Sequence, residues 1–152
     1  LIPALGADGA AAVAVRMLDY ALGEAIAAGV GPVELVAEPL DHPHWATLLA
    51  VERSAQGNGD LGERMARATE RTIARGEQAL LMGTDCPTLD AAAIADLADA
   101  LGNHDAAVIP AATLARIATL GWRIALRPAM HDIDDPADLI HLPAAWLPAP
   151  RP

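Results

Sequence analysis

Acidic residues at two places in the chain have the type and spacing of a metal site. Asp85 follows an apolar run within "ALLMGTDCPTLD", and Asp132 and Asp134 belong to "HDIDD". Ligands of open α/β sheets bind beyond the carboxyl ends of the strands, where Asp85 would lie. A carboxylate there suits Mg²⁺ or Mn²⁺ bridging a substrate diphosphate, because these ions are held by few carboxylates plus phosphate oxygens. From spacing alone, Asp85 could equally stabilise the turn that follows it.

The second acidic segment is harder to explain by structure alone. Alternate side chains of an extended segment share a face, so Asp132 and Asp134 are expected to point the same way. Carboxylates that converge at one sheet edge repel one another unless a cation neutralises them. Helix capping by Asp135 and Asp138 explains those two acids but not the pair before them. Asp134 is therefore the better candidate for a second ligand, with Asp132 beside it.

The glycine-rich stretch "GNGDLGERM" precedes a predicted helix, whose first N–H groups could receive phosphate or ribose oxygens. It is neither a Walker loop nor G-x-G-x-x-G, so it is a weak signal by itself. Asp60 and Glu63 partly cancel its attraction for anions, which favours a role beside a base or sugar. The arginines of this helix share one face, and only Arg64 is close enough to the loop to contact a ligand. We expect the others, Arg67, Arg71 and Arg75, to be solvated among glutamates.

Two further groups carry weaker chemical signals. Cys86 has no histidine base at a fixed spacing and is expected to be a small buried residue rather than a nucleophile. The histidines of "HPH" (42–44) could bind a transition metal, but proline-containing surface loops often carry such histidines without function.

Composition excludes several classes of protein. The 152 residues fit one domain, 1–152, and the net charge of −10 argues against nucleic acid or an anionic membrane as a partner. No window is apolar enough for a membrane span, and no secretion signal is visible. The single cysteine suits a reducing cytoplasm, and the absence of lysine excludes Schiff-base chemistry within this sequence. Because the sequence opens at Leu1 without methionine, we expect an N-terminal piece to be missing.

Helical and strand patterns alternate along the chain. Strands are predicted at 32–37, 78–82, 105–111 and 122–126, with a further strand ending near Asp134. Helices are predicted at 9–28 with Asp8 as cap, within 42–51, from Asp60 to about Arg75, from Asp90 to Gly102, at 113–120, and after Asp135 with Pro136 in first position. The tail from Pro143 is expected to be irregular. This alternation predicts an α/β fold with a mainly parallel sheet.

The ordered combination of three motifs resembles a small bacterial family of glycosyltransferase-like proteins. The motifs are "QGNGDLGERM" (56–65), "LLMGTDCPTLDAAAIADLADAL" (80–101) and "MHDIDDPADL" (130–139). Some members of this family are known as radical-SAM- or selenodomain-associated transferases. The resemblance implies the GT-A or nucleotide-diphospho-sugar transferase fold, a Rossmann-like three-layer α/β/α sandwich.

The same resemblance implies roles for individual residues. Asp85 would take the place of the metal-binding acid of the D-x-D region, and Asp134 with Asp132 would match the second acidic motif. The residues implied to bind the nucleotide-sugar donor are Gly59, Asp60, Leu61, Gly62, Arg64, Gly83 and Thr84. Family members usually also have an N-terminal basic phosphate loop and an Asp-Gly-Gly-Tyr segment. Both are absent here, and we expect them to exist in the protein outside this sequence.

The sequence therefore predicts a cytoplasmic, metal-dependent transferase that uses a nucleotide-activated sugar, with Mg²⁺ or Mn²⁺ as cofactor and a possible homo-oligomeric state. One alternative is a nucleotidyltransferase of the same fold. Another is a degenerate, non-catalytic binding or assembly domain. No residue is identified as the general base.

Overall fold

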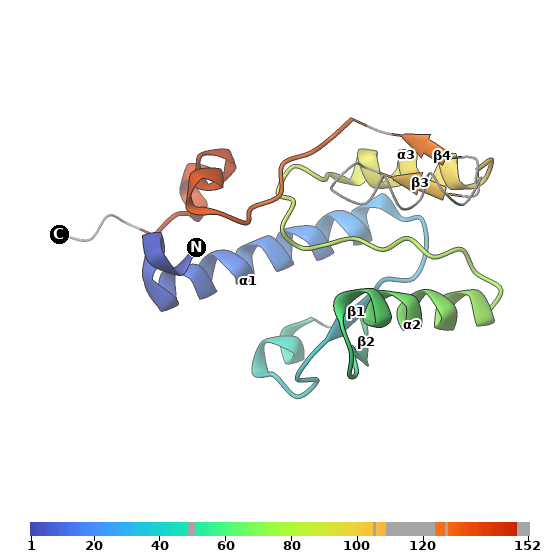
Figure 1. The fold of residues 1–152 in the computed structure, drawn as a ribbon, viewed down its shortest axis with the longest axis horizontal. Helices are drawn as coiled ribbons and strands as arrows, with labels where there is room; N and C mark the ends of the chain where they lie inside the picture. The colour runs from blue at the N-terminus through green and yellow to red at the C-terminus, as the bar shows by residue number, and fades with distance from the viewer. Residues whose placement is uncertain (49–50, 105, 109–123, 127, 149–152) are drawn as a thin grey trace. The chain divides into compact units, whose positions relative to one another are not determined.

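The computed structural model describes residues 1–48, 51–104, 106–108, 124–126 and 128–148. Helices and strands are interspersed along these residues (Figure 1). In chain order they are α1 (Ile2–Ala28), β1 (Glu34–Ala37), the 3₁₀ helix η1 (Pro43–Thr47), β2 (Glu52–Ala55), α2 (Leu61–Ala74), α3 (Ala91–Leu101), β3 (Ala106–Val108), β4 (Ile124–Leu126), and the 3₁₀ helices η3 (Pro136–His141) and η4 (Ala144–Trp146).

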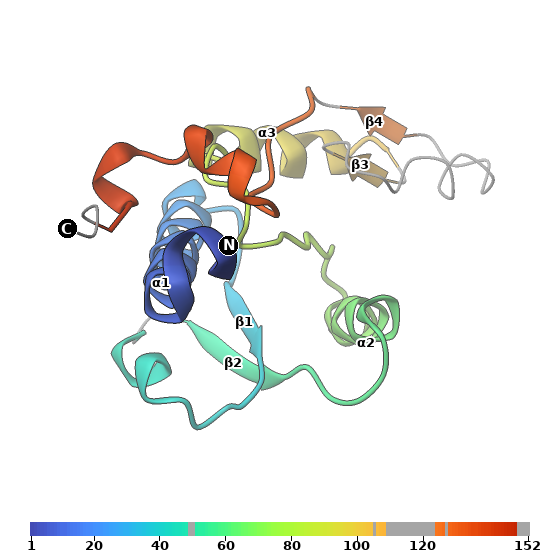
Figure 2. The ribbon, with the colours of Figure 1, turned by 60° about the vertical axis from the view of Figure 1, so that its left-hand side comes forward.

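The strands pair in parallel, as the sequence predicts. β1 lies beside β2, with Glu34 opposite Glu52 and Ala37 opposite Ala55 (Figure 2). β3 lies beside β4, with Ala106 opposite Ile124. Parallel neighbours need a crossover of a dozen or more residues, and the segment between β1 and β2 provides one that contains η1. β1, β3 and β4 fall within the predicted strands at 32–37, 105–111 and 122–126. The sequence gives little sign of β2, because its residues "ERSA" are mostly exposed and polar.

The described residues form two compact units. Unit 1 contains Leu1–Val30 and Gly83–Pro152, and unit 2 contains Gly31–Met82. This division does not test the expected single domain over 1–152, which stays a prediction.

The core of unit 1 joins α1 to the C-terminal segment. Val13 and Met17 of α1 are buried with Ile133 and Leu142, and partly buried side chains such as Trp146 pack against them. Arg16 adds a polar contact, because its Nη1 donates to the backbone oxygen of Ala145 at 3.0 Å. The C-terminal segment therefore lies along the first half of α1 (Figures 1 and 2).

α1 begins earlier than the sequence predicts. The helix starts at Ile2, with a proline in its first turn, and the backbone is non-helical at Gly6 (φ 71°, ψ 172°). The prediction that Asp8 is the N-cap was wrong, because Asp8 lies inside α1, after the non-helical residue Gly6. The predicted end is confirmed, since Gly29 adopts the left-handed conformation that closes helices.

α3 has the predicted cap and the predicted buried stripe. Asp90 Oδ1 accepts the N–H of Ala93 at 2.9 Å, and Ile94 and Leu97 are buried where α3 packs against α1. Glu24 of α1 accepts the N–H of Ala91 at 2.7 Å through Oε2. Two N–H groups in the first turn of α3 thus have side-chain acceptors, and these hydrogen bonds fix the point at which the helix begins.

Two predicted strands were wrong. The run 78–82 is not a strand, and no described strand pairs with it. An apolar run forms a strand only where a neighbour satisfies its N–H and C=O groups, and here Leu81 is 45% exposed. The segment 131–134 is likewise outside any described strand. The helix expected within 42–51 is the short η1, and the helix expected at 113–120 lies outside the described residues.

Candidate functional site

Asp85 lies immediately before a tight turn. The N–H of Leu89 donates to the oxygen of Cys86 at 3.2 Å, and Pro87 within this turn is buried. The Asp85 carboxylate folds back over Gly83, where a Cβ would overlap its Oδ1. Gly83 therefore leaves the space that the Asp85 side chain occupies. Asp85 is half-buried, and Thr84 beside it is exposed.

The segment 131–135 meets this turn directly. The N–H of Ile133 donates to the backbone oxygen of Asp85 at 2.8 Å. The Ile133 side chain is 4% exposed and packs in the core of unit 1. Asp132 and Asp134 flank Ile133 in the sequence, and Asp132 is half-buried while Asp134 is exposed. The structure thus brings the two predicted acidic segments together, although they are far apart in the sequence.

The electrostatics of Asp132 reflect this convergence. Burial raises the pKa of the Asp132 carboxyl above its ordinary value, and the negative charges of Asp85 and Asp134 raise it further, against a smaller lowering by His131. A carboxyl whose pKa is raised by neighbouring negative charges lies in a region where a cation would relieve repulsion.

These residues do not enclose a cation by themselves. Within the described ranges, no group of three or more His, Cys, Asp or Glu side chains converges closely enough to hold a metal ion. The donor set still fits Mg²⁺ or Mn²⁺, because such ions bind through one or two carboxylates and take their remaining ligands from water and substrate phosphates. The ligand roles of Asp85, Asp132 and Asp134 remain predictions.

The 3₁₀ helix η3 holds the acidic segment from its other side. Asp138 Oδ2 accepts the N–H of Asp134 at 3.1 Å and the N–H of Asp135 at 2.7 Å. The hydrogen bond from the N–H of Asp135 is the main cause that lowers the pKa of Asp138, and desolvation opposes it. The hydrogen bond from the N–H of Asp134 and the charges of His141 and His131 also lower this pKa. Asp135 is the N-cap of η3 and Pro136 follows it, as predicted from the sequence.

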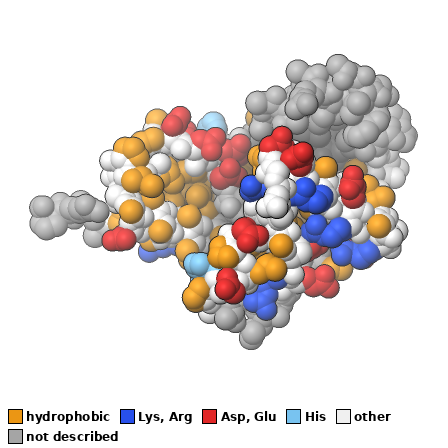
Figure 3. Space-filling view, turned by 60° about the horizontal axis from the view of Figure 1, so that its bottom comes forward, with side chains coloured by type: hydrophobic (Ala, Val, Ile, Leu, Met, Phe, Trp, Pro, Cys, Tyr) orange, Lys and Arg blue, Asp and Glu red, His pale blue; other side chains and the backbone are white. Residues whose placement is uncertain are grey.

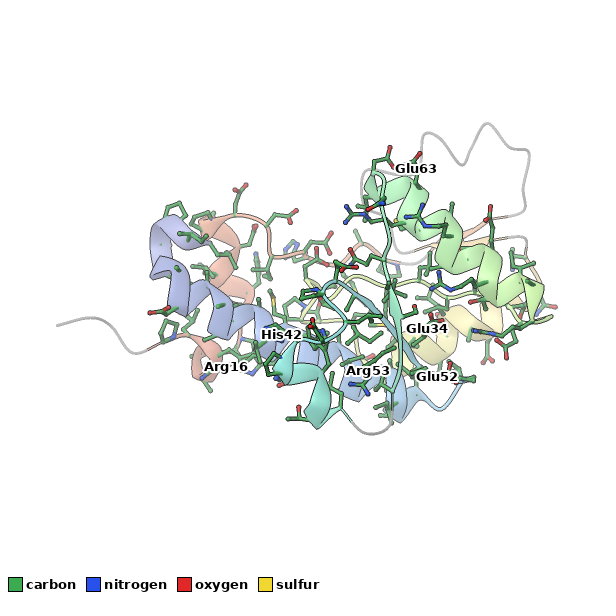
Figure 4. The ribbon with its side chains drawn as sticks, turned by 90° about the horizontal axis from the view of Figure 1, so that it is seen from below. Arg16, Glu34, His42, Glu52, Arg53 and Glu63 are labelled. Carbon is green, nitrogen blue, oxygen red and sulfur yellow. The ribbon has the colours of Figure 1, made fainter. Side chains whose placement is uncertain are left out.

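The glycine-rich loop of unit 2 has the predicted capping geometry. Asp60 Oδ1 accepts the N–H of Glu63, and Glu63 Oε2 accepts the N–H of Asp60, each at 2.9 Å. Gly59 has φ +105°, and a Cβ there would overlap the Glu63 carboxylate, so glycine is required at this position. Glu63 is labelled at the start of α2 in Figure 4. Of the other predicted donor-binding residues in this loop, Leu61 and Gly62 are exposed in the first turn of α2.

The arginines at the start of α2 brace this loop. Arg64 Nε donates to the oxygen of Gly59 at 2.9 Å, and its Nη1 donates to Gln56 Oε1 at 3.0 Å. Arg67 Nη2 donates to the oxygen of Gln56 at 3.0 Å and also to that of Asn58. The prediction that only Arg64 reaches the loop was wrong, because a long guanidinium side chain one turn further along also spans the distance.

Arg71 of α2 and Arg75, the residue that caps its C-terminal end, contact acids rather than water alone. Arg71 Nη2 lies 2.9 Å from Glu34 Oε1 and 2.8 Å from Ser54 Oγ, and Arg75 lies 3.7 Å from the other Glu34 oxygen. Figure 4 labels Glu34 on β1, and Figure 3 shows basic side chains (blue) among acidic ones (red). This network joins the helix to both strands of unit 2, which is a structural role.

The weaker sequence signals lead to no site in the described residues. Cys86 is half-buried, with its Sγ 3.7 Å from Thr88 Oγ1. In "HPH", His42 caps η1 by accepting the N–H of His44 at 3.3 Å, and its ring lies 4.9 Å from that of Trp45. Sequence reasoning missed the contact between the rings of His131 and His141, whose centroids are 4.0 Å apart. No regular spacing links these two residues, so only the fold reveals the pair.

Comparisons with known proteins identify a family and a fold. A family model described as "Uncharacterized protein conserved in bacteria (DUF2064)" matches residues 21–113. A crystal structure described as that of a "putative nucleotide-diphospho-sugar transferase from Desulfovibrio desulfuricans G20" matches with a TM-score of 0.77 and 20% sequence identity. The match covers 88% of this chain and 74% of that one, and it confirms the predicted fold class. No curated protein matches this chain.

None of the helices in the described ranges has the length and apolar character needed to cross a membrane. The expected cytoplasmic location and homo-oligomeric state stay predictions.

Proposed function

Because this chain belongs to the bacterial DUF2064 family and has the fold of a nucleotide-diphospho-sugar transferase, we propose that it is a metal-dependent transferase that takes its sugar from a nucleotide-activated donor. The narrower assignment to the radical-SAM- and selenodomain-associated transferases stays a prediction.

The hydrogen bond from Ile133 to Asp85 is the observation that carries this proposal. It brings Asp85 next to the segment that holds Asp132 and Asp134, in a chain that has ten more acidic than basic side chains. Carboxylates that lie close together repel one another at a cost in free energy, and burial together with the charges of Asp85 and Asp134 raises the pKa of Asp132. A cation-binding role accounts for that cost, and helix capping does not.

In the proposed site, Asp85 and one acid of the 132–134 pair hold Mg²⁺ or Mn²⁺. A divalent cation bound there neutralises the negative charge of a nucleoside diphosphate leaving group. The chain's own contribution is to fix these carboxylates in advance, by the Gly83 turn on one side and by η3 on the other. Positioning of this kind is the main way in which a protein assists a reaction whose chemistry lies in the leaving group.

Donor binding by Gly83 and Thr84 belongs to this same proposal, because both residues immediately precede Asp85 in the sequence. The assignment of Gly59, Asp60, Leu61, Gly62 and Arg64 to the donor is a separate proposal. The bracing of that loop by Arg64 and Arg67 supports it, because a braced loop can present its backbone N–H groups in a fixed arrangement.

Isothermal titration calorimetry of the full-length protein with UDP- and GDP-sugars, with and without Mn²⁺, tests the function. We expect binding that requires Mn²⁺ and weakens by at least about tenfold in Asp85→Ala. Asp99→Ala is the matched control, because Asp99 is an exposed acid of α3 in the same unit. Binding that is indifferent to Mn²⁺, or equal in the two variants, would contradict the proposal.

The products then separate the two enzymatic possibilities. Release of nucleoside diphosphate on addition of an acceptor indicates glycosyl transfer. Release of pyrophosphate from a nucleoside triphosphate indicates nucleotidyl transfer by the same fold.

A further inference from the structure

The 3₁₀ helix η3 holds the acidic segment 131–135 at three points. Asp138 accepts the N–H groups of Asp134 and Asp135. The ring of His141 lies against the ring of His131, with their centroids 4.0 Å apart. Further contact is apolar, because Leu142, which follows η3, is buried in the same cluster as Ile133. One short helix thus contacts this segment before, within and after the predicted ligands.

The contacts of Asp138 have a specific geometric consequence for Asp134. The N–H of Asp134 belongs to the peptide group before its Cα, and the N–H of Asp135 belongs to the peptide group after it. Both donate to the same oxygen, Asp138 Oδ2, at 3.1 and 2.7 Å. When both peptide planes are anchored, φ and ψ of Asp134 are fixed, and so is the direction of its Cα–Cβ bond.

The neighbouring peptide is anchored as well. The N–H of Ile133 donates to Asp85 at 2.8 Å, so three consecutive N–H groups each have a defined acceptor. The first acceptor belongs to the turn that carries Asp85, and the other two bonds end on Asp138. These hydrogen bonds therefore restrain the backbone at Asp134, and with it the direction of the Asp134 Cα–Cβ bond, relative to Asp85.

We propose that Asp138 is a positioning residue, which holds Asp134 in the direction needed to share a divalent cation with Asp85. This inference rests on the proposed function, because it assigns a task to Asp138 within that site. Asp138 acts through the backbone of Asp134 and is not itself a ligand. Outer residues that orient metal ligands typically account for about 10- to 100-fold of metal affinity.

Two substitutions separate this role from that of a nearby negative charge. Asp138→Ala removes the acceptor, whereas Asp138→Asn keeps a side-chain oxygen that can accept both N–H groups but removes the charge. Asp90→Ala is the control for the loss of a helix cap. Asp90 caps α3 in the same unit, where it accepts the N–H of Ala93. All three are made in the full-length protein.

The first measurement is the hydrogen exchange of the Asp134 and Asp135 amides by NMR, without metal. Asp138→Ala should speed exchange at both amides, and Asp138→Asn should retain most of their protection. Equal protection in wild type and Asp138→Ala overturns the inference, because the hydrogen bonds would then fix nothing.

The second measurement is titration with Mn²⁺ alone. Asp138→Ala should bind Mn²⁺ about 10- to 100-fold more weakly, while Asp138→Asn and Asp90→Ala stay close to wild type. Wild-type Mn²⁺ affinity in Asp138→Ala would mean that Asp138 only caps η3. Equal losses of Mn²⁺ affinity in both Asp138 variants would mean that the charge of Asp138, not its hydrogen bonds, affects binding. Either result overturns the inference while the proposed function stands. If wild type binds no Mn²⁺, the proposed function fails and the inference fails with it.

Discussion

Replacing Gly83 by alanine should displace the Asp85 carboxylate while leaving the protein folded. A Cβ at Gly83 would overlap Asp85 Oδ1 and lie 3.4 Å from its Cγ. The obstructed atom is the end of a side chain rather than backbone, so rotation of Asp85 relieves the overlap. Gly83 is also outside the group of glycines with positive φ, so alanine can adopt its backbone conformation.

The change in stability should be small because two effects offset each other. Moving Asp85 out of its present rotamer costs about 0.5–1.5 kcal/mol. Alanine restricts the unfolded chain and so stabilises the folded state by about 0.4–1 kcal/mol. The free energy of unfolding should therefore change by less than about 1 kcal/mol, whereas a displaced ligand should weaken Mn²⁺ binding by at least about tenfold, or 1.4 kcal/mol.

Urea denaturation and Mn²⁺ titration of the same samples measure the two quantities. Gly23→Ala is the matched control, because Gly23 lies within α1 and an added Cβ there meets nothing within 4 Å. It should stabilise the protein by about 1 kcal/mol and bind Mn²⁺ as wild type does. Wild-type affinity in Gly83→Ala would refute the argument that the Asp85 position matters, and a large loss of stability would refute the view that only a side chain must move.

Three further predictions concern stability. Because Ile133 is 4% exposed, Ile133→Ala should lower the free energy of unfolding by about 2–5 kcal/mol, and Ile133→Val by about 0.5–1.5 kcal/mol. Urea titration measures both values. Similar midpoints for the two variants would contradict the packing argument. Gly59→Ala should cost more than about 1 kcal/mol in thermal unfolding, because φ is +105° and the Cβ would overlap Glu63; an unchanged melting temperature would show that the loop rearranges freely. Burial alone would raise the pKa of Glu34, but hydrogen bonds from Ser54 and Arg71 and the charges of Arg71 and Arg75 lower it below its ordinary 4.5. A carboxyl whose pKa is lowered on folding stabilises the protein above its ordinary pKa, and this contribution is lost as the pH falls through the lowered value. Stability should therefore fall less steeply from about pH 5 to about pH 3 in Glu34→Gln than in wild type, and equal slopes would contradict it.

The parts of the fold that depend on local chemistry could be predicted from the sequence. Asp60 with Glu63, and Asp90 before an apolar stripe, identify the starts of α2 and α3, because a cap and its helix lie within a few residues of each other. The run 78–82 shows the limit of such reasoning. The run is apolar, but an apolar run becomes a strand only beside a neighbouring strand, and the sequence does not identify that neighbour.

The candidate site divides in the same way. The types of residue at Asp85, Asp132 and Asp134 indicate a possible cation site, and the structure brings their segments together. The hold of Asp138 on Asp134 was visible only as a capping pattern, since nothing in the sequence states that the capped backbone carries a ligand. The overlap between a Cβ at Gly83 and the Asp85 carboxylate depends on the direction of the Asp85 side chain, and the sequence does not specify that direction.

The hydrogen bond between Ile133 and Asp85 also has a thermodynamic consequence. In an unfolded chain, these segments are separated by nearly half of unit 1, so the carboxylates that flank the bond meet only when that part of the unit has folded. Assembly of the site and folding of the unit are thus a single equilibrium. A ligand that needs both acidic segments binds only the native state, and at a hundredfold excess over its Kd it would stabilise that state by about 2.7 kcal/mol. The melting temperature of the chain is therefore a direct and label-free measure of whatever occupies this site.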